Sequence, residues 1–232
     1  MTFHNAYHGV KKLFTAKLLR LIGAACALIG LVIALLTAGD TIVSMVTSGV
    51  MEADLGKILG GLVISLILIV AFFVLSLIGF IMNLVGLAQA GKDDSSLSTA
   101  FIISIFSFII QIVSYVFMAL NLAGGFVDNI TRAVASVCEI IVFVLIVNGI
   151  TSLAEQLKKN EIIGTGTKLL VVYVISYGLA IVANLVVMFF GITEATAIIA
   201  VIMFALYLVF SMVSYIVYLV FLGKAKNMLR DN

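Results

Sequence analysis

Proline and tryptophan are both absent from this chain of 232 residues, and charged residues make up only 10% of it. A soluble chain of this length would hold about a dozen prolines and about 25% charged residues. Without proline, a sharp kink in a helix has to come from glycine pairs, such as those at 60–61 and 124–125. Without tryptophan, an aromatic belt at a membrane interface has to consist of Tyr and Phe. The low charge excludes a water-facing surface of ordinary composition.

Cysteine and histidine are also scarce, at two residues each. Cys26 and Cys138 lie in apolar segments, where a thiol behaves as a small hydrophobic group, so we predict neither a disulfide nor a metal site. His4 and His8 lie in the amino-terminal segment, outside any H-E-x-x-H motif. There is no G-x-S-x-G elbow, and "GTGTK" at 164–168 lacks the frame of a phosphate-binding loop. We therefore expect no enzyme activity and no cofactor.

Hydrophobic residues, in contrast, make up 64% of the chain, and the mean hydropathy is +1.33. Uninterrupted apolar runs of about 20 residues have the length of transmembrane helices, whereas a β-barrel would show short alternating segments. The sequence thus predicts an all-α, polytopic membrane protein with one domain over 1–232. Its six predicted spans are 18–38, 56–90, 98–123, 126–158, 166–190 and 195–229. The first resembles a signal peptide, but its apolar run of about 18 residues favours a retained helix.

Basic residues are distributed unevenly between the two sides of these spans. Four precede the first span, one follows the second, three follow the fourth and three lie in the tail, which is eleven of thirteen on one side. The positive-inside rule places that side, with both termini, in the cytoplasm, as expected for a multi-pass protein of the cell membrane. Because the basic residues flank membrane spans, the net charge of +2 does not indicate a nucleic-acid partner. The partners we expect are membrane lipids, with a small solute or ion and a second copy of the chain as further hypotheses.

The predicted spans alternate in length. The odd ones have about 20 to 25 residues and the even ones about 33 to 35, which exceeds the bilayer core of about 30 Å. The even helices should therefore tilt or extend into the cytoplasm. Their ends resemble one another: "GLAQAGKDD" at 86–94, "SLAEQLKKN" at 152–160 and "GKAKNMLRDN" at 223–232. This similarity predicts three consecutive helical hairpins around a pseudo-threefold axis, although the need for polar cover at each helix end also produces similar ends.

The connection at 37–57 is the longest between two predicted spans. Its apolar residues Ile42, Met45, Val46 and Val50 follow helical spacing. This pattern fits a short helix in the outer membrane interface, and a plain loop is the alternative.

Polar residues recur along the third predicted span at intervals of three and four. In "SIFSFIIQIVSYVFMALN" at 104–121 they are Ser104, Ser107, Gln111, Ser114 and Asn121. Such a repeat places them on one face of a helix in a left-handed bundle. Other predicted spans carry comparable faces, which include Asn83, Tyr173, Tyr177, Asn184, Tyr207 and Ser211. Two interpretations stay open: these faces pack the helices together, or they line a polar pathway.

The fourth predicted span carries three charged residues on one face. Asp128, Arg132 and Glu139 lie within about 40° of one another around a helix, and Glu139 lies about 20 Å from its start. A carboxylate at that depth is costly and is by default a hypothesis of a functional site. One alternative is a protonated Glu139 that is hydrogen-bonded to Gln111 or a Tyr. The other is a carboxylate that couples protons or binds a cation.

Three functions are compatible with these features. The first is a transporter or channel for an ion or small solute, which uses the polar faces and Glu139. The second is a non-transporting scaffold or partner-binding protein that presents the ends of its long even helices. The third is a lipid-binding membrane protein whose polar groups open laterally between helices.

Overall fold

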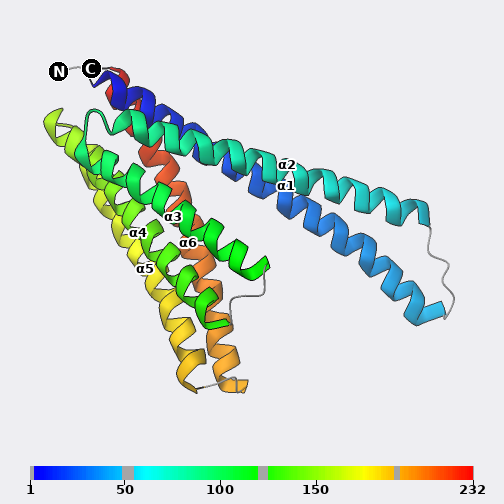
Figure 1. The fold of residues 1–232 in the computed structure, drawn as a ribbon. Helices are drawn as coiled ribbons and strands as arrows, with labels where there is room; N and C mark the ends of the chain where they lie inside the picture. Colours follow the sequence, from blue (N-terminus) through cyan, green and yellow to red (C-terminus); the bar gives the residue numbers. More distant parts are fainter. Residues whose placement is uncertain (1–2, 49–54, 120–124, 191–193, 232) are drawn as a thin grey trace. The chain divides into compact units, whose positions relative to one another are not determined.

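The computed structural model describes residues 3–48, 55–119, 125–190 and 194–231, which form six α-helices (Figure 1). They are α1 (His4–Ser48), α2 (Leu55–Ala90), α3 (Ser95–Ala119), α4 (Gly125–Gln156), α5 (Asn160–Phe190) and α6 (Glu194–Arg230). Every helix contains a segment long and apolar enough to cross a membrane. The described ranges contain no strand. The prediction of an all-α, six-helix membrane protein is confirmed.

The predicted alternation in helix length is wrong. α1 is the longest helix, with 45 residues, and α5 has 31 residues against 32 in α4. The length of an apolar run gives only the length of the continuously apolar part of a helix. α1 begins before that part, with an amphipathic segment in which Ala6, Val10 and Leu13 are buried. Such a segment keeps helical spacing without being continuously apolar.

The predicted connection at 37–57 is also corrected. The backbone continues as α1 through Ser48, so these residues form neither a separate interfacial helix nor a loop that begins at 37. Residues 49–54 lie outside the described ranges. The absence of proline and of a glycine pair between 38 and 48 leaves the helix without an interruption there.

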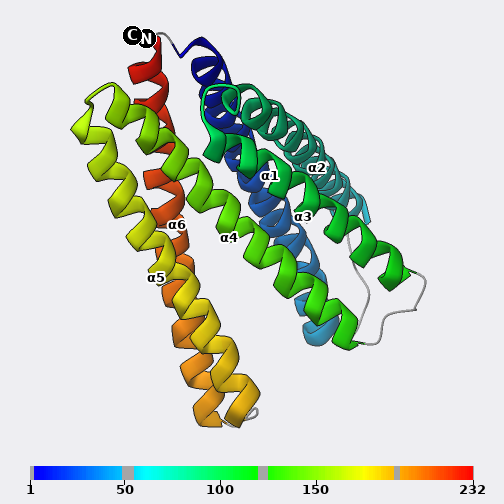
Figure 2. The ribbon, with the colours of Figure 1, turned by 60° about the vertical axis from the view of Figure 1, so that its left-hand side comes forward.

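The chain divides into two compact units. The first contains Met1–Phe14 and Leu84–Asn232, and the second contains Thr15–Asn83. Within the first unit α3 packs on α4, α5 packs on α6, and α4 also contacts α5 and α6 (Figure 2). These neighbours are consecutive along the chain, and the pseudo-threefold arrangement of hairpins stays a prediction.

The core of the first unit lies at the end where α1, α3 and α5 begin and α2, α4 and α6 end. We call this region the packed end; its large, fully buried side chains are Val10, Leu13, Leu87, Leu97, Val147, Ile150, Leu153, Leu169, Phe221 and Leu222. The similar ends seen in the sequence supply this core, with Leu87 and Ala90 from α2, Leu153 and Ala154 from α4, and Ala225 from α6. All three ends therefore contribute side chains to one shared core.

Glycines bring α1 and α2 together at the packed end. A Cβ on Gly9 would lie 2.5 Å from the carbonyl oxygen of Gly86, and a Cβ on Gly86 would lie 2.8 Å from the carbonyl oxygen of Gly9. A side chain at either position would clash with the facing backbone. This close approach therefore requires glycine on both helices.

Two aspartates in the turn between α2 and α3 cap two different helices. Asp93 accepts hydrogen bonds from Asn5 Nδ2 at 2.9 Å and from the backbone N–H of Ala6 at 2.7 Å, in the first turn of α1. Asp94 Oδ1 accepts from two backbone N–H groups in the first turn of α3, at 2.9 and 3.2 Å. Carboxylates at helix amino termini satisfy free N–H groups and complement the helix dipole. The turn thereby fixes the start of both helices.

The turn between α4 and α5 ends α4 without a glycine. Lys158 has a φ of 55° in the left-handed region. The N–H of Lys159 donates to the carbonyl of Ala154 at 2.9 Å, and that of Lys158 donates to Glu155 at 3.0 Å. These two bonds define a Schellman motif, in which glycine usually occupies the position of Lys158.

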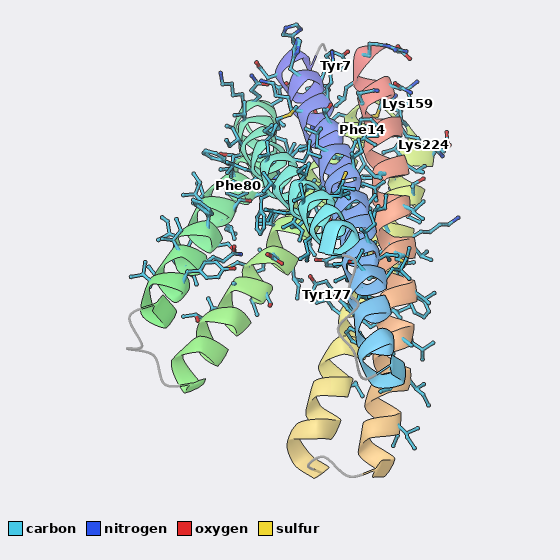
Figure 3. The ribbon with its side chains drawn as sticks, turned by 90° about the vertical axis from the view of Figure 1, so that its right-hand side faces the viewer. Tyr7, Phe14, Phe80, Lys159, Tyr177 and Lys224 are labelled. Atoms are coloured by element: carbon cyan, nitrogen blue, oxygen red, sulfur yellow. The ribbon has the colours of Figure 1, made fainter. Side chains whose placement is uncertain are left out.

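Charged side chains surround the packed end. Lys224 Nζ on α6 lies 2.6 Å from Glu161 Oε1 on α5, with both side chains exposed. Lys226 Nζ lies 4.9 Å from the centre of the Phe14 ring. Figure 3 labels Phe14 and Lys224 in this region. The Lys224–Glu161 pair is exposed and solvated, so it contributes little to the stability of the packed end.

In the second unit, the small residues of α1 face α2. A Cβ on Gly30 would lie 3.1 Å from the Cβ of Leu68, and one on Gly79 would lie 3.0 Å from the carbonyl oxygen of Ala16. The buried hydroxyl of Ser65 donates to the Gly61 carbonyl of its own helix at 2.8 Å. Small residues therefore allow α1 and α2 to approach closely within this unit.

The membrane-crossing segments are exposed and apolar. In the most hydrophobic part of each, at most 39% of the residues are buried. The exposed side chains are chiefly Leu, Ile, Val and Phe, for example Leu28, Leu66, Ile102, Val174 and Val201. In water such a surface would aggregate, whereas lipid tails solvate it. The chain is an integral, multi-pass membrane protein.

Candidate functional site

Ser104 and Ser176 form hydrogen bonds within their own helices. Ser104 Oγ on α3 donates to the Ala100 carbonyl at 2.8 Å, and Ser176 Oγ on α5 donates to the Val172 carbonyl at 2.9 Å. Serine hydroxyl groups in apolar helices commonly donate to the backbone carbonyl four residues earlier. For Ser104, the hydroxyl group is thus satisfied within α3.

Gln111 behaves differently, because its amide reaches a neighbouring helix. Gln111 Nε2 on α3 donates to Glu139 Oε1 on α4 at 3.4 Å. A hydrogen bond between these two side chains was one of the alternatives predicted for Glu139. Glu139 lies fourteen residues after Gly125, about 21 Å along α4, within the membrane-crossing segment Val134–Gln156. The Gln111 side chain is half-buried, and that of Glu139 is exposed. An amide donor thus holds a carboxylate at membrane depth.

Aromatic rings continue this polar contact towards α5 and α6. Phe143 follows Glu139 by one helical turn and stacks on Tyr173 of α5, with ring centres 3.6 Å apart and planes at 11°. The ring of Tyr177 lies 4.6 Å from that of Tyr173 at 44°, and Tyr218 of α6 lies 5.0 Å from Phe143. We call Gln111, Glu139, Phe143, Tyr173 and Tyr177 the Glu139 cluster. Figure 3 labels Tyr177, which lies along α5 away from the packed end.

Glu139 and Phe143 lie on the same face of α4, one helical turn apart. Through the stack of Phe143 on Tyr173, this face of α4 meets the phenol rings of Tyr173 and Tyr177 on α5. A carboxylate beside phenol groups can accept hydrogen bonds, take up a proton or bind a cation, and ring faces add attraction for positive charge.

The structure brings together only some of the residues singled out in the sequence. Gln111, Glu139 and Tyr177 belong to the cluster. Tyr207 is half-buried on α6, and its ring centre lies 6.1 Å from that of Phe204. Ser211 is half-buried on α6, and Asn83 is buried in the second unit. The side chains of Ser114, Arg132 and Asn184 lie outside the described residues, as do Asn121 and the predicted Asp128–Arg132 pair.

Phe143 belongs to the cluster but was not among the residues predicted from the sequence, and Tyr173 was predicted only as part of a polar helix face. The available signal was spacing, since Phe143 follows Glu139 by four residues and Tyr173 precedes Tyr177 by four. Residues at that spacing share one face of a helix. That the two faces meet depends on how α4 and α5 are packed, which spacing alone does not specify.

Comparisons with protein-family models, with curated proteins and with solved structures found no match to this chain. Among the described residues, no three His, Cys, Asp or Glu side chains gather where they would hold a metal ion. The interpretation of the site therefore rests on the geometry of the Glu139 cluster.

Proposed function

We propose that this membrane protein is a transporter or channel for a small cation or a proton-coupled solute, with Glu139 as its ion-binding carboxylate. The observation that carries the proposal is the contact between Gln111 and Glu139 inside a membrane-crossing segment. An acidic residue at the centre of a membrane helix costs about 2.5 to 3.5 kcal/mol. Glu139 is exposed rather than enclosed by its own chain, which suits a group that exchanges a proton or an ion.

The packing of the helix ends favours this function over a scaffold. A scaffold of the kind considered above would present the ends of α2, α4 and α6 to a partner. The apolar residues at those ends, such as Leu87, Leu153 and Leu229, are instead buried in the core of the first unit. The exposed side chains there include the charged pair Lys224 and Glu161.

Ion flux into liposomes tests the proposal. The full chain is reconstituted in liposomes, and flux is recorded for protons with a pH-sensitive dye and for a panel of monovalent cations, choline included, with radiolabelled tracers. We expect Glu139→Gln to lower the flux at least tenfold, because the amide neither binds a proton nor neutralises a cation. Glu155→Gln is the matched control, since Glu155 is an exposed carboxylate near the end of the same helix. Wild-type flux no higher than in empty liposomes, or equal flux in Glu139→Gln, would reject the proposal.

A further inference from the structure

We propose that the Glu139 cluster binds an organic ammonium ion, a singly charged amine or quaternary ammonium with small apolar substituents. This inference rests on the proposed function and names its substrate class. It starts from the kinds of group in the cluster, which are one carboxylate, one amide and three aromatic rings.

This set of groups fits an organic cation better than a metal cation. Hard cations such as Ca²⁺ and Mg²⁺ need about six or more oxygen ligands in a defined geometry. An alkylammonium needs one counter-charge and apolar or aromatic walls, because cation–π attraction replaces ligand bonds. Glu139 supplies the single negative charge, and Phe143, Tyr173 and Tyr177 supply the walls.

The ring geometry provides such walls next to the carboxylate. Phe143 stacks on Tyr173 with the ring planes nearly parallel, and Tyr173 also contacts Tyr177, so the three rings form one continuous aromatic surface. Tyr177 is tilted by 44° to Tyr173, and the two rings meet at an angle rather than in a closed stack. Both tyrosines are half-buried and Glu139 is exposed, so a ligand can reach them.

Desolvation favours the same class of ligand. A compact inorganic ion at membrane depth loses a strongly bound hydration shell, which a single carboxylate does not replace. An ammonium with apolar substituents spreads its charge over a larger surface and is bound by aromatic cages in other proteins. Gln111 donates a hydrogen bond to Glu139 and so orients the carboxylate.

Equilibrium dialysis of radiolabelled choline against the purified full chain in detergent tests the inference. The uncharged carbon isostere 3,3-dimethyl-1-butanol and sodium ions serve as competitors. We expect choline to bind, sodium to compete weakly and the isostere to compete at least tenfold less well than unlabelled choline. Glu139→Gln should weaken choline binding at least tenfold, and Tyr173→Leu about five- to thirtyfold, the range of a partly desolvated cation–π contact.

Three further variants separate a binding role from a structural one. Tyr173→Phe keeps the ring and should keep choline affinity within about twofold, since the ring face rather than the hydroxyl makes the contact. Tyr115→Leu removes an exposed ring from α3, and Glu155→Gln removes an exposed carboxylate from α4. Both should bind choline as wild type does, and circular dichroism should show unchanged helix content in every variant.

The outcomes distinguish this inference from the proposed function. If choline does not bind, or if Glu139→Gln and Tyr173→Leu bind it normally, the organic-ammonium inference is wrong. It is equally wrong if the isostere competes as well as choline, because the site is then merely apolar. In each of these cases a Glu139-dependent flux of protons or inorganic cations would leave the proposed function standing.

Discussion

The carboxyl-terminal end of α4 and the middle of the same helix differ in how tightly they are packed. At the packed end, Ile150 and Leu153 are fully buried in a core to which the other five helices also contribute side chains. Around Glu139, Val137 is 54% exposed and Ile141 is 41% exposed. The same helix therefore changes, within about four turns, from a core helix of a compact bundle to a helix with an open apolar surface.

This difference separates the stability of the first unit from its proposed activity. Buried apolar surface, helix caps and a glycine contact all lie at the packed end. The Glu139 cluster lies in the more exposed part, where few contacts have to be broken for a ligand to enter or for helices to move. Regions that bind or move are commonly drawn from the less stable part of a protein.

Truncating a core side chain of α4 tests this separation with the largest expected effect. Leu153→Ala should destabilise the protein by about 2 to 5 kcal/mol, because it leaves a cavity in a fully packed site. Val137→Ala, on the exposed part of the same helix, should change stability by less than about 0.5 kcal/mol. Thermal unfolding in detergent micelles measures both. Equal losses in the two variants would show that stability is spread evenly along α4.

A methyl group at the glycine contact should have the next largest effect. Gly9→Ala places a Cβ 2.5 Å from the Gly86 carbonyl oxygen, so the backbones must separate, at about 1 to 3 kcal/mol. Gly164→Ala is the matched control, since a Cβ on that α5 residue meets nothing within 4 Å. It should be neutral or stabilise by up to about 1 kcal/mol, because alanine favours a helix. A stability of Gly9→Ala equal to that of Gly164→Ala would contradict the close contact.

The same contrast explains what was predictable from the sequence. The six helices follow from their apolar runs, because membrane depth imposes a minimum length on each. Gln111 and Glu139 stand out individually, since polar groups are rare and costly in such runs. The length of α1 was underestimated because its amphipathic start, with Ala6, Val10 and Leu13 buried, looks partly polar in sequence.

The aromatic half of the cluster was not predictable for a different reason. Phe143 is one of sixteen Phe residues in the chain, and nothing local separates it from those that face lipid. Its role depends on the stack with Tyr173, which follows from the rotation and register of α4 against α5. Helix packing allows several registers for the same pattern of apolar residues.

The smallest predicted effect lies in the turn that closes the packed end. Lys158 adopts a φ of 55°, a conformation that costs a residue with a Cβ about 1 kcal/mol and costs glycine almost nothing. Lys158→Gly should therefore stabilise the protein by about 0.5 to 1 kcal/mol, which thermal unfolding detects as a higher midpoint. Lys159→Gly, one residue later and without a positive φ, should bring no gain. If both variants lower the midpoint, side-chain contacts of Lys158 outweigh its backbone strain. If only Lys158→Gly raises it, the packed end can be stabilised through its backbone without altering the Glu139 cluster.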